Sequence, residues 1–475
     1  MLPKNLKYQN KVESATANAY TSNVSPQNGS GPYTAGQTII INIPTRSNLC
    51  LVGSESTLKF SLTTTNSGTD SNYVRLDRGG ASGVIQRLRL YSGSNLLEDV
   101  DSYGLLMANL ISLQKSNASV RGKFNITNGT RNDDIVEFNT TPAAGNVLGT
   151  NNGSGRSYIC PGGEKLWSTT ETAVILANAV TGSGTATAPT RTYCISLLSI
   201  LGSLGSQYVP LFAMAGSGPL RLELQLVDSG NKFLCSQQTV SAFTLTNVEY
   251  VASFLELSDS SMETINNSLG GQPLQYVIPS FRNYVYTAYL PSGGAQINVP
   301  IASKFSSLKS LFGVMRDSAN TNNATFYPHS SAHYGLSSYN LRIGSKIIPA
   351  KAPSSISEFF IEACKAIGSV SDINHCPTMN MFSYGVATNT ANTETPVLQS
   401  KTSASNNFMI GCDLEVYANA DKDSIFSGYN SLNDDIFCQM ILAGTGNNIA
   451  SLRFDFYALY DSLLICENQT AYTKF

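Results

Sequence analysis

The sequence has few charged residues, few histidines and a single tryptophan. Asp, Glu, Lys and Arg make up 13% of its 475 residues, about half of the roughly 25% found in typical soluble domains. A surface made polar by Asn, Ser, Thr, Gln and Tyr, with a net charge of only −2, is unusual for a free monomer and suits a protein covered by neighbouring subunits. The near-neutral charge also gives no overall electrostatic basis for binding nucleic acid.

Membrane-spanning and secretory segments are missing as well. No apolar run reaches the roughly 18–20 residues that cross a bilayer as a helix, and residues 1–7 lack the apolar centre of a signal peptide. The nine cysteines are odd in number, show no Cys-x-x-Cys spacing and mostly lie in apolar runs such as Tyr193-Cys194-Ile195. We therefore expect buried, reduced thiols and synthesis in a reducing compartment.

The same succession of short segments occurs twice. Ile-Asn-Ile-Pro at residues 41–44 returns as Ile-Asn-Val-Pro at residues 297–300, an offset of 256 residues. Gly-Ser-Asn-Leu-Leu at residues 93–97 returns as Gly-Ser-Lys-Ile-Ile at residues 344–348, an offset of 251 residues. Two further pairs keep the same order at similar offsets. A repeat near 250 residues is the size of a whole domain, which predicts two tandem copies of one domain.

Strands, a hairpin and one short helix are expected in the first copy. Residues 38–43 are β-branched, residues 56–65 alternate apolar and polar, and residues 84–97 read as strand, turn and strand. A helix is predicted next, with Asp101 or Ser102 as its cap. Its apolar stripe is formed by Leu105, Leu106, Met107, Leu110, Ile111 and Leu113.

The second copy has a helix at the matching place. Ser355 and Glu358 form a capping box, in which each side chain can accept from the other residue's N–H group. Phe359, Phe360, Ala363, Cys364 and Ile367 follow at helical spacing, and Gly368 is expected to end the helix. The duplication is therefore predicted in the secondary structure as well as in the sequence.

The two copies differ in length. Their closing strands end near Leu257 and Cys466, an offset of only 209 residues, so the first copy holds about forty added residues. We place these residues within 125–190, which are dense in Asn, Gly, Ser and Thr, and expect long exposed loops on the outer face of the assembled particle. The expected division is an extended arm (1–34), a first domain (35–257), a polar linker (258–271) and a second domain (272–475).

About eight short strands with turn-rich connections and one helix per copy are typical of a jelly-roll β-sandwich. We therefore expect an all-β fold of two tandem eight-stranded jelly rolls, with the long loops inserted in the first.

No motif in the sequence points to catalysis. His329 and His333 lie four residues apart, but Tyr327-Pro328 and Gly335 make a poor helix for a shared metal, and the third histidine, His375, stands beside Cys376. The acids Glu98, Asp99, Asp101, Asp434 and Asp435 lie beside turns or a helix start, where capping and solvation are the expected roles. Residues 202–206 carry serines without a nucleophile elbow, and the glycine pairs at 79–80 and 293–294 are expected in turns.

We therefore expect no catalytic, cofactor-binding or metal-binding residues and no cofactor. The predicted arm has only Lys4, Lys7 and Lys11 in its first twenty residues, too few for the dense basic runs that package nucleic acid. No specific nucleic-acid binding is expected.

Several segments resemble the double-jelly-roll major capsid proteins of tailless icosahedral viruses, particularly polinton-like viruses, virophages and their relatives. The likeness is carried by residues 85–99, by residues 201–211 followed by 220–224, and by residues 338–346 in the second copy. The resemblance implies two jelly rolls standing side by side, perpendicular to the capsid surface. It also implies a homotrimer with six jelly rolls that tiles an icosahedral shell, outer towers formed by loops, and terminal arms beneath the shell.

The function expected from this resemblance is that of a non-catalytic major capsid protein in the virion, assembled in the host cytoplasm or nucleus. Its partners would be itself, neighbouring capsomers and penton or minor capsid proteins. Two alternatives stay open. One is a minor capsid, penton or spike protein, or a single-jelly-roll shell protein with a protruding domain. The other is a carbohydrate-binding or carbohydrate-active tandem β-sandwich, for which the single Trp167 offers little sugar-stacking surface.

Overall fold

The computed structural model describes most of the chain. The described residues are 17–66, 73–115, 119, 122–130, 165–168, 186–187, 190–202, 208–236, 240–318, 328–367, 384, 407–416, 426–443 and 448–475. Most of the predicted insertion within 125–190 lies outside these residues, as do Tyr327, His375, Cys376, Gly368 and the three lysines of the arm.

The first half of the chain is a sandwich of two four-stranded sheets. Their strand orders are β1-β13-β4-β10 and β2-β11-β6-β7, and neighbouring strands are antiparallel. The strands are β1 (Ala17–Val24), β2 (Thr38–Ile43), β4 (Thr57–Asn66), β6 (Ile85–Ser92), β7 (Asn95–Asp101), β10 (Arg191–Ile195), β11 (Leu220–Leu226) and β13 (Val240–Leu257).

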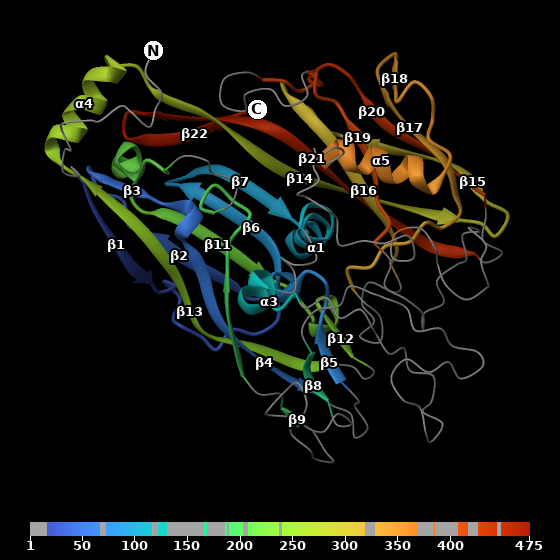
Figure 1. The fold of residues 1–475 in the computed structure, drawn as a ribbon, viewed down its shortest axis with the longest axis horizontal. Helices are drawn as coiled ribbons and strands as arrows, with labels where there is room; N and C mark the ends of the chain where they lie inside the picture. Colours follow the sequence, from blue (N-terminus) through green and yellow to red (C-terminus); the bar gives the residue numbers. More distant parts are fainter. Residues whose placement is uncertain are drawn as a thin grey trace, which may run out of the picture.

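The second half repeats this arrangement strand for strand. Its sheets have the orders β14-β21-β16-β19 and β15-β20-β17-β18, which match the first half position by position. The strands are β14 (Leu274–Leu290), β15 (Ala295–Ile301), β16 (Leu308–Asp317), β17 (Leu336–Ile343), β18 (Lys346–Ile348), β19 (Ile410–Asp413), β20 (Ile436–Leu442) and β21 (Ile449–Glu467). The predicted duplication of the fold is therefore confirmed, and Figure 1 shows the two halves beside each other.

Additional elements decorate this repeat. In the first half, β3 and β9 extend one sheet, and β12-β5-β8 form a small separate sheet. The added strands are β3 (Leu49–Leu51), β5 (Tyr73–Leu76), β8 (Lys165–Ser168), β9 (Ala186–Thr187), β12 (Leu234–Ser236) and, at the end of the second half, β22 (Thr470–Lys474). The helices are α1 (Tyr103–Gln114), α3 (Lys123–Asn128), α4 (Asp259–Leu269) and α5 (Ile356–Ile367), with short 3₁₀ turns η2 (Gly53–Glu55), η3 (Gly80–Val84), η4 (Leu211–Ser217) and η5 (Gly230–Lys232).

Alternation of apolar residues explains why the strands form where they do. On β4, Leu58, Phe60 and Leu62 are buried, as the sequence predicts for a strand with one face in the core. The prediction of a buried thiol is wrong for Cys194. This residue lies on the outer side of β10, between buried Tyr193 and Ile195, and is exposed. The cysteines at positions 50, 364, 412, 438 and 466 are buried, as expected.

Strand β1 lies within the segment that the sequence predicts to be an arm. It pairs with β13 over its full length, from Ala17 opposite Leu257 to Val24 opposite Tyr250. Its side chains are mostly exposed, so backbone hydrogen bonds rather than apolar burial hold it in place. One of the eight strands of the first sandwich, β1, therefore lies before residue 35. The sequence did not predict it, because the strand is polar and has no periodic pattern of apolar residues.

Helix α1 occupies the centre of the molecule. Every residue from Tyr103 to Leu113 is buried, because the helix lies between the two sandwiches rather than on a surface (Figure 1). Ser102 is the residue that precedes the helix, as predicted, but its side chain does not cap it. Ser102 has a left-handed backbone (φ 49°) and makes no capping hydrogen bond, and Oδ1 of Asp101 instead accepts from the N–H of Ser102 and from Gln86.

The predicted capping box of α5 is confirmed. The N–H of Glu358 donates to Oγ of Ser355 at 3.3 Å, and the N–H of Ser355 donates to Oε2 of Glu358 at 3.2 Å. The apolar face of the helix, with Phe359, Ala363 and Cys364 buried, packs on β19 and β16.

The end of the chain ties the second half to the first. After β21, the chain turns at Asn468 and Gln469, both at positive φ, into β22. The carbonyl of Ala471 accepts from Asn95, and the carbonyl of Gln469 accepts from the N–H of Gly216. The predicted linker, 258–271, contains helix α4, which is capped by Ser258 and ended by Gly270 in a left-handed conformation.

The contact between α5 and its sheet predicts a large effect for one glycine. A Cβ at Gly411 would lie 2.8 Å from Cα of Ala363, so Gly411→Ala should push α5 off β19 and lower the free energy of unfolding by about 1–3 kcal/mol. Gly293→Ala is the matched control, because a Cβ there meets no atom within 4 Å. Chemical denaturation of both variants measures this, and equal effects would contradict the packing described.

Candidate functional site

Charged side chains from both halves meet in a buried joint. Asp77 precedes η3 in the first half, and its Oδ2 accepts from the backbone N–H of His329 and lies 3.1 Å from that residue's Nδ1. The neighbouring Arg78 donates twice to the carbonyl of His329, at 2.6 and 3.1 Å. Arg78 also donates to Oδ1 of Asn109 on α1 at 2.6 Å. The two halves therefore complete each other's hydrogen bonding here.

A second ion cluster lies beside this joint. Arg316 on β16 and Arg453 on β21 both pair with the fully buried Asp455, at 2.7 and 2.8 Å. Arg316 donates to the carbonyl of Pro328, and Tyr457 donates its hydroxyl to the carbonyl of Ser102 at the start of α1. Apart from Ser102, none of these residues was predicted from the sequence. The one feature of the sequence that could have indicated the cluster is the presence of charged residues inside otherwise apolar strands, in a chain with little charge.

The joint perturbs several pKa values. Burial alone would raise the pKa of Asp77, but the neighbouring His329 and Arg78 hold it below its ordinary value. The pKa of Asp455 is likewise lowered by its two arginines against the effect of burial. Burial, aided by repulsion from Arg316 and opposed by Asp77, lowers the pKa of Arg78 to about 10. The two aspartates are thus held ionised, and the joint is structural in character.

The two nearby histidines enter different environments. His329 belongs to the joint, whereas His333 packs between Phe359 and Phe408 in the core of the second half. Both lie outside helices and strands, as the poor helical sequence predicts, but both are buried, at 6% exposure, rather than on the surface. Burial lowers the pKa of His333 to about 4. Tyr334, beside it, accepts from the N–H of Asp317.

The acidic residues singled out in the sequence lie apart and have different partners. Asp99 pairs with Arg87 at 2.6 Å, and Asp435 pairs with Lys304 at 3.0 Å. Asp434 accepts from the hydroxyl of Tyr429. Glu98 was predicted to be solvated but is 3% exposed, because β7 turns it toward residues 199–200.

Burial of Glu98 makes it titrate unusually. Its Oε2 accepts from Oγ of Ser199 at 2.6 Å and from the N–H of Ile200 at 3.2 Å. Burial raises the pKa of Glu98 to about 7, although these two hydrogen bonds lower it in part. The candidate acids therefore do not form a pair of carboxylates facing one cleft.

The predicted glycine turns are present. Gly79 and Gly80 lead into η3, and Gly294 closes a turn with its N–H on the carbonyl of Pro291. Gly202 donates to the carbonyl of Ser199, while residues 203–206 lie outside the described part of the chain.

Within the described residues, no three His, Cys, Asp or Glu side chains gather in a way that could hold a metal ion. The helices in that part of the chain are also too short or too polar to cross a membrane.

The outer face of β2-β11-β6-β7 is covered by ion pairs. On β11, Arg221 and Glu223 point outward and lie 3.2 Å apart, and Glu223 also pairs with Arg89 at 3.3 Å. The guanidinium of Arg221 lies over the ring of Tyr91. These charges satisfy one another within the subunit.

The equivalent face of the second half, β15-β20-β17-β18, is almost uncharged. Phe437 and Ile441 occupy the positions on β20 that Arg221 and Gln225 hold on β11, and they are 37% and 49% exposed. The strand register places Pro300, Phe437, Arg342 and Ile347 in one row across the sheet. The next row is made of three amide side chains, those of Asn298, Gln439 and Asn340. We call this surface the β20 face. An exposed sheet face with aromatic and aliphatic side chains and little charge suits a protein contact.

The ion cluster yields one prediction. Asp455→Asn removes the carboxylate shared by Arg316 and Arg453 and should lower the free energy of unfolding by about 3–5 kcal/mol, the usual effect of breaking a buried ion pair. Asp435→Asn is the control, because its side chain is 81% exposed and its pair should contribute less than about 1 kcal/mol. Denaturant unfolding of both variants measures the two effects. A small effect of the substitution at Asp455 would refute the structural role of the ion cluster.

Glu98 yields a pH-dependent prediction. Because its pKa rises to about 7 on folding, the folded chain binds more protons than the unfolded chain between about pH 4.5 and pH 7, and stability falls as the pH rises through this window. Glu98→Gln removes this loss. The stability of the variant relative to the natural chain should therefore increase by up to about 3 kcal/mol from pH 4 to pH 8.

Thermal unfolding at several pH values tests this, with Glu263→Gln on the exposed helix α4 as the control. A difference that does not change with pH would contradict the burial of an ionisable Glu98.

Comparison with known proteins gives matches at the level of structure only. No sequence-family model and no curated protein matches the chain. The structure is similar to that of PBCV-1 VP54 fitted into a reconstruction of the virophage Sputnik, with a TM-score of 0.59 and 10% identity over 99% of this chain and 100% of that chain.

Two further structures show the same likeness. A chain of the Sputnik virophage has a TM-score of 0.60 and 12% identity, over 100% of this chain and 92% of that one. The mavirus major capsid protein has a TM-score of 0.56 and 11% identity, over 100% of this chain and 93% of that one. These proteins are double-jelly-roll major capsid proteins. The expected fold is thus confirmed: the chain has the all-β fold of the double-jelly-roll major capsid proteins, two tandem jelly rolls in one polypeptide.

Proposed function

We propose that the chain is a major capsid protein that assembles as a trimeric, pseudo-hexameric capsomer and tiles an icosahedral shell, without catalytic activity. The observation that carries this proposal is the likeness of both halves to viral capsid proteins over nearly the whole length of each chain. Two matched eight-stranded sandwiches in one chain supply six such units in a trimer, which is the shape that a six-sided lattice position requires.

Composition supports the same role. Because only 13% of its residues are charged, the chain has less surface charge than a soluble free monomer usually relies on. The β20 face adds a specific surface where Phe437, Ile441 and Ile347 are exposed together without charges of the kind that cover the first half. We propose that this face packs against a neighbouring copy of the chain in the trimer.

The proposed division of the chain follows from the repeat. The arm (1–34) contributes β1 to the first jelly roll (35–257), α4 fills most of the linker (258–271), and the second jelly roll (272–475) ends with β22. Where the structure describes the insertion within 125–190, it holds the end of α3 and the strands β8 and β9 rather than loops alone. We propose that this insertion lies on the outer face of the shell. Partners would be neighbouring capsomers and penton or minor capsid proteins, and the site of action would be the virion, after assembly in the host cell.

Native mass spectrometry of the purified full chain tests the oligomeric state. The proposal predicts a trimer as the main species at micromolar concentration. A stable monomer as the main species would contradict it, and turnover of a glycan by that monomer would favour a carbohydrate-active β-sandwich instead.

Charge placed on the β20 face should weaken the trimer. Phe437→Lys together with Ile441→Lys introduces two ammonium groups that would lose hydration on assembly, so the trimer should dissociate at a concentration at least about tenfold higher. Ile126→Lys on α3 is the matched control, because this side chain is apolar and 80% exposed but lies far from that face in the chain and on another element. Mass photometry over a dilution series measures the effect, and equal behaviour of the two variants would exclude this face as the contact.

A further inference from the structure

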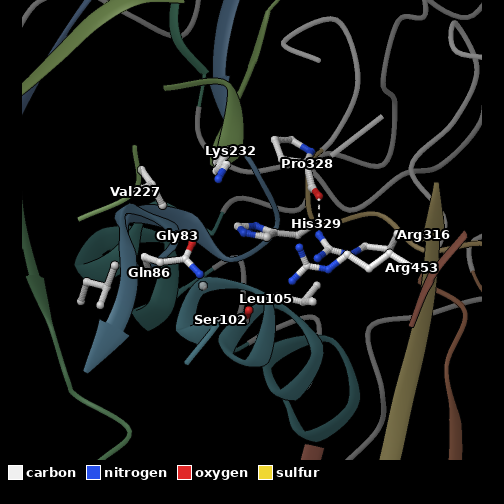
Figure 2. A pocket seen from close by; sticks show the side chains of 12 residues that line it. Gly83, Gln86, Ser102, Leu105, Val227, Lys232, Arg316, Pro328, His329 and Arg453 are labelled. Carbon is white, nitrogen blue, oxygen red and sulfur yellow. Dashed lines mark hydrogen bonds between the residues drawn. The ribbon is translucent and has the colours of Figure 1, made fainter. Parts of the chain in front are cut away.

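A polar cavity of about 100 Å³ opens at the joint between the halves. This is several times the roughly 10–15 Å³ that one water molecule needs by the same measure. The side chains of Lys232 from the first half and of Arg316, His329 and Arg453 from the second line it, and no carboxylate does. Figure 2 shows their nitrogen-bearing ends converging on one space from four separate segments.

The N-terminus of α1 opens into the same cavity. The first helical hydrogen bond runs from the N–H of Leu106 to the carbonyl of Ser102, so the N–H groups of Gly104 and Leu105 have no acceptor within the helix. Both residues line the cavity, and Ser102 supplies no capping bond. Free N–H groups and the positive end of the helix dipole together favour an anion.

His329 provides an independent indication. The residue is 6% exposed and its ring lines the cavity. Nδ1 lies 3.1 Å from Oδ2 of Asp77 but without hydrogen-bond geometry, and no hydrogen bond joins Nε2 to any residue that the structure describes. Nε2 lies beside Gly104, 3.1 Å from where a Cβ would stand. The buried Nδ1 thus faces Asp77 without a hydrogen bond, and the hydrogen-bonding capacity of Nε2 is left for a ligand in the cavity to satisfy.

The charges around the cavity are unevenly placed. Arg316 and Arg453 share the single carboxylate of Asp455, which lies behind them and does not line the cavity. Asp101, another carboxylate near Arg453, has its Oδ1 occupied by the N–H of Ser102 and by Gln86. Lys232 pairs with Asp228 at 2.9 Å, and this carboxylate does not line the cavity either. The cavity wall therefore presents cationic side chains and N–H donors but no carboxylate.

We propose that this cavity binds a small tetrahedral oxyanion of the phosphate or sulfate class. Such an anion would accept from the N–H groups of α1 in the first half and from arginine in the second half, so it would fasten the two jelly rolls together. The site is independent of the proposed capsid role.

Equilibrium dialysis of the purified full chain against radiolabelled inorganic phosphate tests the proposal. The buffer contains no other oxyanion, and its ionic strength is held constant. Saturable binding of one phosphate per chain, displaced by sulfate, is expected. Absence of saturable binding would show that the cavity holds water only and would overturn the proposal.

Two lysine variants locate the site. Lys232→Gln removes a partly exposed charge at the rim of the cavity, so the variant should fold and bind phosphate about tenfold more weakly. Lys304→Gln is the matched control, since Lys304 is also partly exposed and also pairs with an aspartate, but on the surface of the second half. Equal affinities of the two variants would place the anion elsewhere and refute the assignment.

Discussion

The structure depends on the pairing of charges that are buried between the two sandwiches. A charge taken out of water costs several kcal/mol unless partners surround it. Asp77 and Arg78 find hydrogen-bond partners in the backbone of His329, which belongs to the other half, and Asp77 also lies 3.1 Å from Nδ1 of that residue. Neither half can satisfy these groups alone, so the joint couples the folding of one sandwich to that of the other. Helix α1, buried on all sides, occupies the space that this coupling encloses.

The fold is a duplication of one jelly roll, and the two copies differ in the residues of their outer faces. The inward residues of β11 and β20 are all apolar or cysteine, and both strands pack into a core. Their outward residues have diverged. Arg221 and Glu223 form an ion pair on β11, whereas Phe437 and Ile441 are exposed apolar side chains on β20, available for contact. Six similar sandwiches with two kinds of outer face would let a three-fold object occupy a six-sided position.

Sequence patterns predicted the strands and helices whose signals are local. The strands β2 and β4 and the capping box of Ser355 and Glu358 follow from β-branching, alternation and side-chain hydrogen bonding alone. What could not be predicted depends on contacts between distant segments. The polar strand β1 is held by β13, Glu98 is buried by residues 199–200, and His329 meets Asp77 across about 250 residues of sequence. The capping of α1 failed as a prediction for the same reason, since the helix start faces the joint rather than solvent.

Electron cryomicroscopy of the purified, assembled protein is the most direct test of the central claim, that two unequal jelly rolls joined as one rigid block form a capsid building unit. The account predicts three-fold particles with six upright sandwiches, in which the two sandwiches of each chain keep the relative position set by Asp77, Arg78 and His329. Particles of another symmetry, or sandwiches that vary in relative position within one chain, would contradict it.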